Sequence, residues 1–353
     1  MSACTDRLLL YCRAGFEQEC AAEILERAAA LGVAGQVEAR PEAAFVVFVP
    51  NTAENLLPLR KRLRFASLTF ARQLIFTTAP ALELPVGDRI SVLLNCARRL
   101  SERFSTLVLD YPDTNQGKRL STFVRKFAPL FRQALERSTR LDDPQAPRLH
   151  LFWLSSAAAY VGLSIPGNSS PWPLGIPRLK LPRGAPSRST LKLEEAFQTF
   201  LENPPQALRP GLTAVDLGAA PGGWTWQLVR RHIHTVAVDN GPLDPALLES
   251  GLVEHRRTDG FRYRPAKPVD WLVCDMLEQP ARIAALVGDW LARGWCRHAI
   301  FNLKLPMKKR YEEVQRCRSL IEARLRPKGI RCRLAFKQLY HDRAEVTGYA
   351  TLS

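Results

Sequence analysis

The chain has 353 residues and a formal net charge of +16, from 50 Lys and Arg against 34 Asp and Glu. This length predicts two or three domains, and so large a positive excess favours a nucleic acid as partner over an acidic protein or a small anion. The sequence lacks a transmembrane segment and the features of a signal peptide, which excludes a membrane or exported protein and predicts a cytoplasmic one.

Residues 1–80 are expected to form a ferredoxin-like α+β subdomain. Short apolar runs alternate there with one amphipathic segment, which predicts strands at residues 8–12 and 44–49 and a helix at residues 18–31. The apolar spacing in that helix predicts that Cys20, Ile24 and Leu25 face the core.

Residues 81–165 are expected to form a second small α+β domain. The predicted elements are a helix at 90–104, a strand at 106–110, a basic amphipathic helix at 121–137 and paired strands at 149–154 and 159–163. A basic helix on a small domain suits RNA binding, although the same pattern fits any small domain.

Residues 166–186 contain six prolines and therefore cannot form a helix or a central strand. We expect a proline-rich linker between domains. Its aromatic and basic side chains could also contact RNA, but the linker interpretation is favoured. Those side chains are Trp172, Arg178, Lys180 and Arg183.

Residues 187–353 alternate strands and helices, which predicts a Rossmann-like, doubly wound and mostly parallel sheet. Expected strands lie at 214–217, 236–238, 271–274 and 299–303, and expected helices at 190–201, 225–231, 281–292 and 311–325. Residues 329–339 and 346–352 are expected to close the domain as a hairpin. Ligands of such sheets bind at the carboxyl ends of the strands.

The first of these strands leads into a loop of small residues, Gly218-Ala219-Ala220-Pro221-Gly222-Gly223. Glycine permits positive φ and a close approach of backbone to a cofactor. Pro221 removes an N–H that a pyrophosphate could have used, and the spacing departs from the dinucleotide fingerprint. The loop therefore favours a nucleoside cofactor without a diphosphate, S-adenosylmethionine, over an ordinary βα turn.

Charged residues stand at the ends of the other strands. Asp239 lies about twenty residues past the loop, where a carboxylate typically binds ribose hydroxyls. Asp259 could reach the adenine, although a solvated turn aspartate is nearly as plausible. Asp275 and Lys304 follow neighbouring strands, and we expect them to pair, because an ammonium leaving a buried strand needs a partner. A purely structural ion pair is the alternative.

Methylation of a hydroxyl group fits these residues best. Lys304 could accept the hydroxyl proton while Asp275 orients it. Methylation of base amino groups commonly uses an Asp/Asn-Pro-Pro-aromatic stretch, but here Met276, Leu277 and Glu278 follow Asp275. Carbon-5 methylation needs a cysteine, and Cys274 should point away from Asp275 as a core thiol. The eight cysteines show neither Cys-x-x-Cys spacing nor His-rich neighbours, so no metal site is expected.

The chain resembles the RrmJ/FtsJ-like ribose 2′-O-methyltransferases, and within that group those that modify one cytidine of 23S rRNA. The resemblance covers nearly the whole chain, starting at Tyr11-Cys12-Arg13-Ala14-Gly15-Phe16-Glu17. Its most specific stretches are residues 175–180, 187–197, 216–224, 238–241, 301–313 and 339–346. Ala220 is a departure, since relatives often have Cys there.

The resemblance implies the site residues. It implies a catalytic tetrad of Lys192, Asp275, Lys304 and Glu345, with Lys304 as proton acceptor. It implies cofactor contacts at Ser187, Ala220, Pro221, Gly222, Gly223, Asp239, Asp259 and Asp275. It also implies a THUMP RNA-binding domain after the ferredoxin-like subdomain. Without the resemblance, Lys192 and Glu345 would rank as surface charges.

The expected function is therefore S-adenosylmethionine-dependent 2′-O-methylation of a cytidine in 23S rRNA, whether free or in a large-subunit assembly precursor. Basic residues that could bind this RNA gather at 60–64, 118–126, 308–310 and 316–333. No obligate protein partner is expected. Two alternatives are an RNA chaperone that only binds and, much less favoured, a nicotinamide-dependent dehydrogenase, which would leave the charge unexplained.

Overall fold

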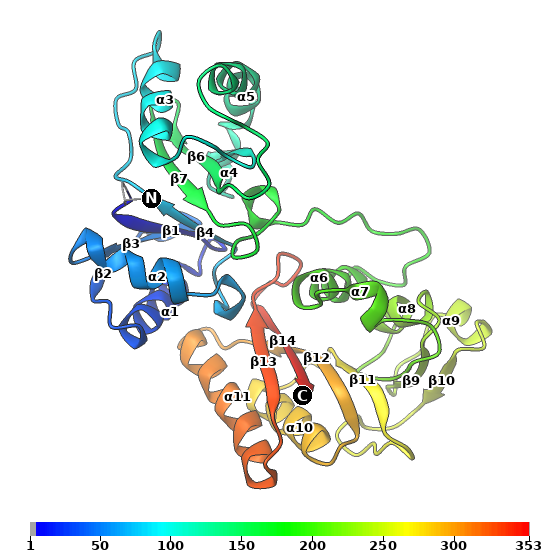
Figure 1. Cartoon of the computed structure of the whole chain (residues 1–353). Helices are drawn as coiled ribbons and strands as arrows, with labels where there is room; N and C mark the ends of the chain where they lie inside the picture. Colours follow the sequence, from blue (N-terminus) through cyan, green and yellow to red (C-terminus); the bar gives the residue numbers. More distant parts are fainter. Residues whose placement is uncertain (1–4, 353) are drawn as a thin grey trace. The chain divides into compact units, whose positions relative to one another are not determined.

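The computed structural model describes residues 5–352, which form two compact units divided between Pro177 and Arg178 (Figure 1). Each unit is built on its own seven-stranded sheet. Within the described residues, no helix has the length and apolarity needed to cross a bilayer. The seven cysteines in this range are all free thiols.

The first unit has a mixed sheet in the order β2-β3-β1-β4-β7-β6-β5. Its strands are β1 (Arg7–Tyr11), β2 (Gly35–Ala39), β3 (Phe45–Pro50), β4 (Gln73–Thr77), β5 (Leu107–Asp110), β6 (Arg148–Ser155) and β7 (Ala158–Ser164). The predicted antiparallel pair β6–β7 is confirmed. Because β4 also pairs with β7, through Phe76 and Leu163, one sheet runs through the regions expected as two separate domains.

The helices of the first unit are α1 (Glu17–Ala30), α2 (Leu56–Arg62), α3 (Arg89–Leu100), α4 (Asn115–Lys118) and α5 (Ser121–Glu136). Alternation along β6 gives the sheet two apolar faces. Leu151 and Trp153 pack with Leu93 of α3 and Phe131 of α5, whereas Phe152 belongs to a cluster on the other face with Tyr11. The basic helix expected at 121–137 is thus present and is held by its apolar side.

Two local expectations were wrong. Leu25 is 40% exposed, because the buried stripe of α1 runs through Cys20, Ala21, Ile24 and Ala28 and leaves Leu25 beside it. The helix expected at 90–104 ends at Leu100, where Ser101 turns extended, yet Phe104 is still fully buried in the core.

The proline-rich segment divides into two parts. Residues 166–177 belong to the first unit. There the Gln73 side chain donates from Nε2 to the Ser170 carbonyl at 3.0 Å, and the Leu174 N–H donates to Asp110 Oδ1 at 3.1 Å. Only a single 3-10 turn, Pro173–Gly175, interrupts the irregular backbone. The part expected as a free connection is therefore packed in its first half, because buried polar groups of the sheet bind its backbone.

The second unit has the sheet order β10-β9-β8-β11-β12-β14-β13. Its strands are β8 (Thr213–Leu217), β9 (His234–Val238), β10 (Val253–Arg256), β11 (Val269–Cys274), β12 (Cys296–Lys304), β13 (Cys332–Lys337) and β14 (Glu345–Leu352). The first five are joined by parallel pairing, and β14 runs antiparallel to both β12 and β13. The expected mostly parallel sheet with a closing hairpin is confirmed.

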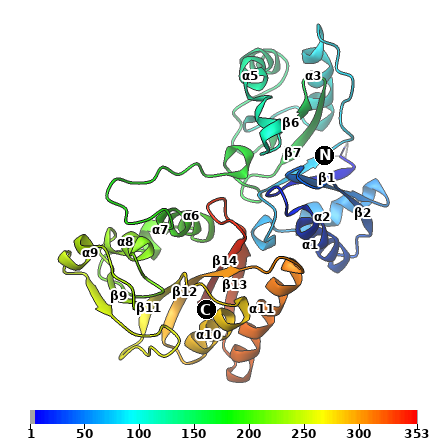
Figure 2. The same ribbon diagram turned by 180° about the vertical axis from the view of Figure 1, so that it is seen from behind.

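Helices cover both faces of this sheet (Figure 2). They are α6 (Thr190–Phe200), α7 (Pro204–Ala207), α8 (Gly223–Val229), α9 (Pro245–Glu249), α10 (Pro280–Ala292) and α11 (Arg310–Leu325). Phe197 of α6 and Trp224 of α8 pack on Trp271 of β11 in one core cluster, while α10 and α11 pack together on the opposite side. The carboxyl ends of β8, β9, β11 and β12 consequently meet at one edge.

Candidate active site

The glycine loop between β8 and α8 is built for close backbone approach. Gly218 and Gly222 have φ values of +80° and +114°, which residues with a Cβ rarely adopt. At Gly223 a Cβ would lie 2.3 Å from Ser189 Oγ and 2.4 Å from Ser187 Oγ. Those two hydroxyls are themselves 2.7 Å apart. The segment before α6 is therefore packed directly on the loop, and a side chain at Gly223 would prevent this packing.

Asp239 clamps the same loop from the end of β9. Its Oδ2 accepts from the Ala220 N–H at 3.0 Å, and its Oδ1 accepts from the Gly241 N–H at 2.7 Å. Each carboxylate oxygen retains a further lone pair for a ligand hydroxyl. Asp239 thus stands where the sequence placed it, with a structural contact that the sequence did not indicate.

Asp259 lies in the turn after β10, and its side chain is half exposed. Its Oδ1 accepts from the Phe261 N–H at 2.8 Å, the geometry of an Asx turn. The neighbouring Gly260 and the loop residue Gly218 both abut Met276, since a Cβ on either would lie 2.7 Å from that side chain. Met276 therefore connects the Asp259 turn to the glycine loop, a role that its position after Asp275 did not reveal.

Asp216, inside β8, is a buried acid that sequence analysis did not assign to the site. It accepts from the Thr225 hydroxyl at 2.6 Å, which ties β8 to α8 beneath the loop. Complete burial raises the pKa of Asp216 to about 7, although the hydrogen bond from Thr225 opposes this. The loop is thus anchored by a carboxyl group that holds a proton more firmly than usual.

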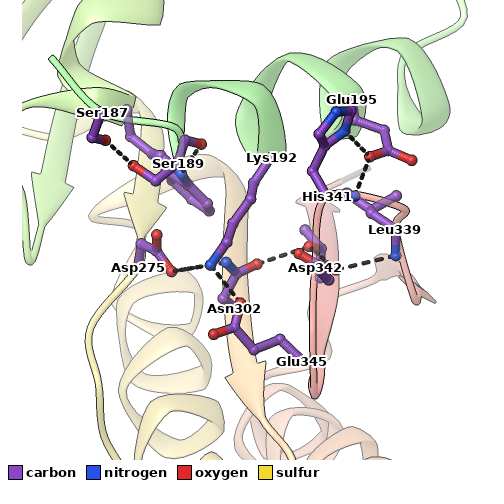
Figure 3. A network of polar contacts seen from close by, with 12 residues as sticks. Ser187, Ser189, Lys192, Glu195, Asp275, Asn302, Leu339, His341, Asp342 and Glu345 are labelled. Atoms are coloured by element: carbon purple, nitrogen blue, oxygen red, sulfur yellow. Dashed lines mark hydrogen bonds and ion pairs between the residues drawn. The ribbon is translucent and has the colours of Figure 1, made fainter. Parts of the chain in front are cut away.

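Three charged side chains from separate segments meet at the strand ends (Figure 3). Lys192 of α6 places its Nζ 2.5 Å from Glu345 Oε2, at the start of β14, and 3.6 Å from Asp275 Oδ1, after β11. All three side chains are about four-fifths buried, with relative exposures of 17%, 20% and 21%. The structure thus brings together three of the four residues that the resemblance implied as a tetrad.

The charges of this cluster stabilise one another. Burial lowers the pKa of Lys192, but Asp275 and Glu345 together outweigh it, so the net pKa is raised and the group stays an ammonium. Burial raises the pKa of Asp275, and Lys192 and Asn302 reduce that effect. Lys192 is therefore a fixed positive charge rather than a ready proton acceptor.

Lys304 ends β12 with an exposed side chain. Its Cα lies opposite that of Glu345 in the β12–β14 ladder. The expected Asp275–Lys304 ion pair is not formed: within residues 5–352 the ammonium paired with Asp275 is that of Lys192. The reason is register, because Cys274 lies opposite Phe301, which puts Asn302 level with Asp275 and Lys304 two residues beyond.

Cys274 is fully buried, as expected for a core thiol. Burial raises its pKa to about 12, so the thiolate that carbon-5 methylation needs would be scarce at neutral pH. This geometry disfavours a cysteine nucleophile next to Asp275.

A second layer of polar residues supports the cluster. Asn302 Nδ2 donates to Asp275 Oδ1 at 2.8 Å, and Thr347 and Asp342 continue the chain of contacts (Figure 3). In α6, the Glu195 carboxylate accepts from the Tyr340 and His341 N–H groups of the β13–β14 connection at 2.8 and 2.9 Å. Sequence analysis missed this layer. Only Asn302 left a signal, since it lies on the same strand face as Lys304.

Comparisons with known proteins agree with this architecture. Family models match at residues 5–75 (RlmM ferredoxin-like domain), 88–165 (ribosomal RNA large subunit methyltransferase M, N-terminal) and 185–332 (FtsJ-like methyltransferase). The chain is 62% identical over 345 residues to the ribosomal RNA large subunit methyltransferase M of Methylococcus capsulatus, covering 98% of each. Its identity to the protein of that name from Cellvibrio japonicus is 53% over 346 residues, covering 98% of this chain and 99% of the relative.

Among solved structures, TrmN from Thermus thermophilus aligns with 98% of this chain and 99% of its own, at 15% identity and a TM-score of 0.35. So weak a likeness says nothing about function.

Proposed function

The chain belongs to the ribosomal RNA large subunit methyltransferase M family and is an S-adenosylmethionine-dependent methyltransferase of ribosomal RNA, and from this premise we propose that it methylates the ribose 2′-hydroxyl of one cytidine in 23S rRNA. The observation that carries the proposal is the Lys192–Asp275–Glu345 cluster next to the glycine loop. The substrate is the free rRNA or a large-subunit assembly precursor in the cytoplasm.

The cluster and the loop are joined through the backbone. The Asp275 N–H donates to the carbonyl of Leu217, the residue before Gly218, at 3.2 Å. On the other side, the Lys192 N–H donates to the Ser189 carbonyl at 3.0 Å, and Ser189 packs on Gly223. Charges held this close to a cofactor loop are placed to act on the group that receives the methyl.

The glycine loop fits S-adenosylmethionine, which when bound supplies an electrophilic methyl group on a sulfonium. Gly222 and Gly223 let the loop pack closely on Leu247 and on the Ser187 and Ser189 hydroxyls. Ser187, Ala220, Pro221, Gly222 and Gly223 would hold the cofactor through this compact loop. Asp239 would accept from ribose hydroxyls, and Asp259 and Asp275 would contact the nucleoside and the cationic part. The three carboxylates around the loop suit a ligand of positive charge.

Lys304 is proposed as the proton acceptor because the other lysine is held as an ammonium by two carboxylates. With the cofactor bound, attack of the 2′-oxygen on the methyl carbon would break the methyl–sulfur bond and leave a neutral thioether, and Lys304 Nζ would take up the hydroxyl proton. Lys192 stabilises the negative charge that develops on the oxygen, and Asp275 and Glu345 hold Lys192 in place. In-line attack requires the nucleotide to be unpaired or splayed from its helix.

The test uses labelled S-adenosylmethionine and large-subunit rRNA that lacks its modifications, followed by nuclease digestion and mass spectrometry. We expect one 2′-O-methylcytidine with the wild type and none with Lys304→Ala, while both bind the cofactor equally. Lys267→Ala, an exposed lysine outside the site and outside the basic clusters, is the matched control and should still transfer. Label on a base, or normal turnover by Lys304→Ala, would refute the ribose assignment or the role of the base respectively.

A further inference from the structure

Behind the Lys192–Asp275–Glu345 cluster, the polar contacts form a linear chain of hydrogen bonds. Asn302 of β12 lies opposite Thr347 of β14 in the antiparallel ladder. Asn302 Nδ2 donates to Asp275 Oδ1 at 2.8 Å, and its Oδ1 is 2.8 Å from the Thr347 hydroxyl. The same hydroxyl is 3.0 Å from Asp342 Oδ2 (Figure 3).

Assigning a donor and an acceptor to each hydrogen bond of this chain requires a hydrogen on the Asp342 carboxyl group. Asp275 faces the Lys192 ammonium and is an acceptor, so the amide of Asn302 must present N–H to it and its oxygen to Thr347. The single hydroxyl hydrogen of Thr347 is then used on Asn302. What remains between Thr347 and Asp342 is a hydroxyl lone pair facing a carboxyl oxygen, which is a hydrogen bond only if Asp342 is protonated.

We propose that Asp342 is a neutral carboxylic acid at neutral pH and a positioning residue for catalysis. It donates to Thr347, and thereby fixes the Asn302 amide with its N–H toward Asp275. The catalytic part of this inference rests on the proposed function above, whereas the protonation state of Asp342 does not.

Burial and the surrounding charges favour the neutral form. Asp342 and Thr347 are fully buried and Asn302 nearly so. Asp342 Oδ1 has no hydrogen-bond partner among the described residues, and its Oδ2 also accepts from the Leu339 N–H at 3.1 Å. A buried carboxylate with one oxygen unsatisfied would be costly, whereas a neutral acid is much less so.

The neighbouring ionisable groups add to this preference. Burial raises the pKa of Asp342 well above its usual value and Glu345 and Glu195 raise it further, while Lys192 and the hydrogen bond from the Leu339 N–H oppose this rise without cancelling it. Glu195 is engaged elsewhere, by the Tyr340 N–H and by the His341 N–H and ring, and is not a donor to Asp342. A third negative charge, on Asp342, would also compete with Asp275 and Glu345 for Lys192.

Two measurements test the inference. The first labels aspartate carboxyl carbons with carbon-13 and follows the Asp342 resonance, assigned by its absence in Asp342→Asn, by NMR from pH 6 to pH 8. We expect a shift typical of a protonated carboxyl throughout that range. A carboxylate shift would overturn the proposal, whatever the enzyme does to RNA.

The second compares matched variants in methyl transfer. Thr347→Val keeps the shape but removes the hydroxyl, and we expect kcat to fall by roughly tenfold to hundredfold with unchanged cofactor affinity, as for a catalytic group displaced by a fraction of an ångström. Thr347→Ser, which retains the hydroxyl, should stay close to wild type. Asp342→Asn keeps a donor toward Thr347 but loses the acceptor for the Leu339 N–H, so it should lose less activity than Asp342→Ala. Equal activity of Val and Ser at 347, or equal loss for Asn and Ala at 342, would overturn the positioning role. An inactive wild type would instead refute the proposed function.

Discussion

Replacing Gly223 with alanine would push a methyl group into the hydroxyls of Ser187 and Ser189. The new Cβ would lie 2.4 and 2.3 Å from their oxygens, well inside van der Waals contact, and 3.2 Å from the Thr190 nitrogen. Both serines precede a helix whose Thr190 hydroxyl donates to the Gly223 carbonyl at 3.1 Å, so they cannot retreat freely. Overpacking of this kind costs about 1–3 kcal/mol.

If Ser187 and the loop backbone contact the cofactor, that strain falls on binding. A loss of about 1.4–2.8 kcal/mol corresponds to a dissociation constant roughly tenfold to hundredfold higher, measurable by calorimetry with S-adenosylmethionine. Gly87→Ala is the control, since nothing lies within 4 Å of a Cβ there and its φ is not positive. Adding Ser189→Ala to Gly223→Ala should recover part of the affinity. An unchanged dissociation constant in a folded Gly223→Ala protein would refute the assignment of this loop to the cofactor.

Three further outcomes are expected. The pKa of Asp216 is about 7 in the folded protein against an ordinary value of 3.8, so folding takes up a proton and the free energy of unfolding of the wild type falls as pH rises between these values. Asp216→Asn has no such pH dependence, and between pH 5 and pH 8 its free energy of unfolding should gain about 3 kcal/mol relative to wild type, measured by urea unfolding of the second unit. A difference between the two proteins that does not change with pH would contradict the raised pKa. Cys274→Ala should retain methyl transfer in the labelled assay, because the thiol is buried and protonated. Loss of transfer in a folded variant would instead support Cys274 as a nucleophile. Glu345→Gln should lower the pKa of Lys192 and reduce turnover without weakening cofactor binding in calorimetry; unchanged turnover would exclude a catalytic role for the pair.

Much of the second unit was predictable from the chain alone. Its central strands are apolar runs that are buried on both faces, and such runs stand out from the amphipathic helices between them. β10 was missed because Val-Glu-His-Arg contains one apolar residue and lies at the sheet edge, where half of each side chain can remain solvated. β2, with the sequence Gly-Gln-Val-Glu-Ala, was missed at the other sheet's edge for the same reason.

The geometry of the candidate site was predictable only where it depends on the local backbone. The glycine loop and Asp239 could be recognised because a tight turn and a carboxylate at a strand end are set by neighbouring residues. Lys192 and Glu345 could not be recognised from the residues themselves, since they lie 153 positions apart and each resembles a surface charge. They entered through the family resemblance.

By itself, the sequence determined most of the strand and helix order of the second unit, the glycine loop and the charged residues that follow the strands. Only the tertiary structure decided how those side chains pair. Register places Asn302, not Lys304, level with Asp275, and the packing of α6 brings Lys192 to the two carboxylates. Ion pairs and proton positions depend on distances of a few ångströms and on burial, and both arise only when segments remote in the chain come together.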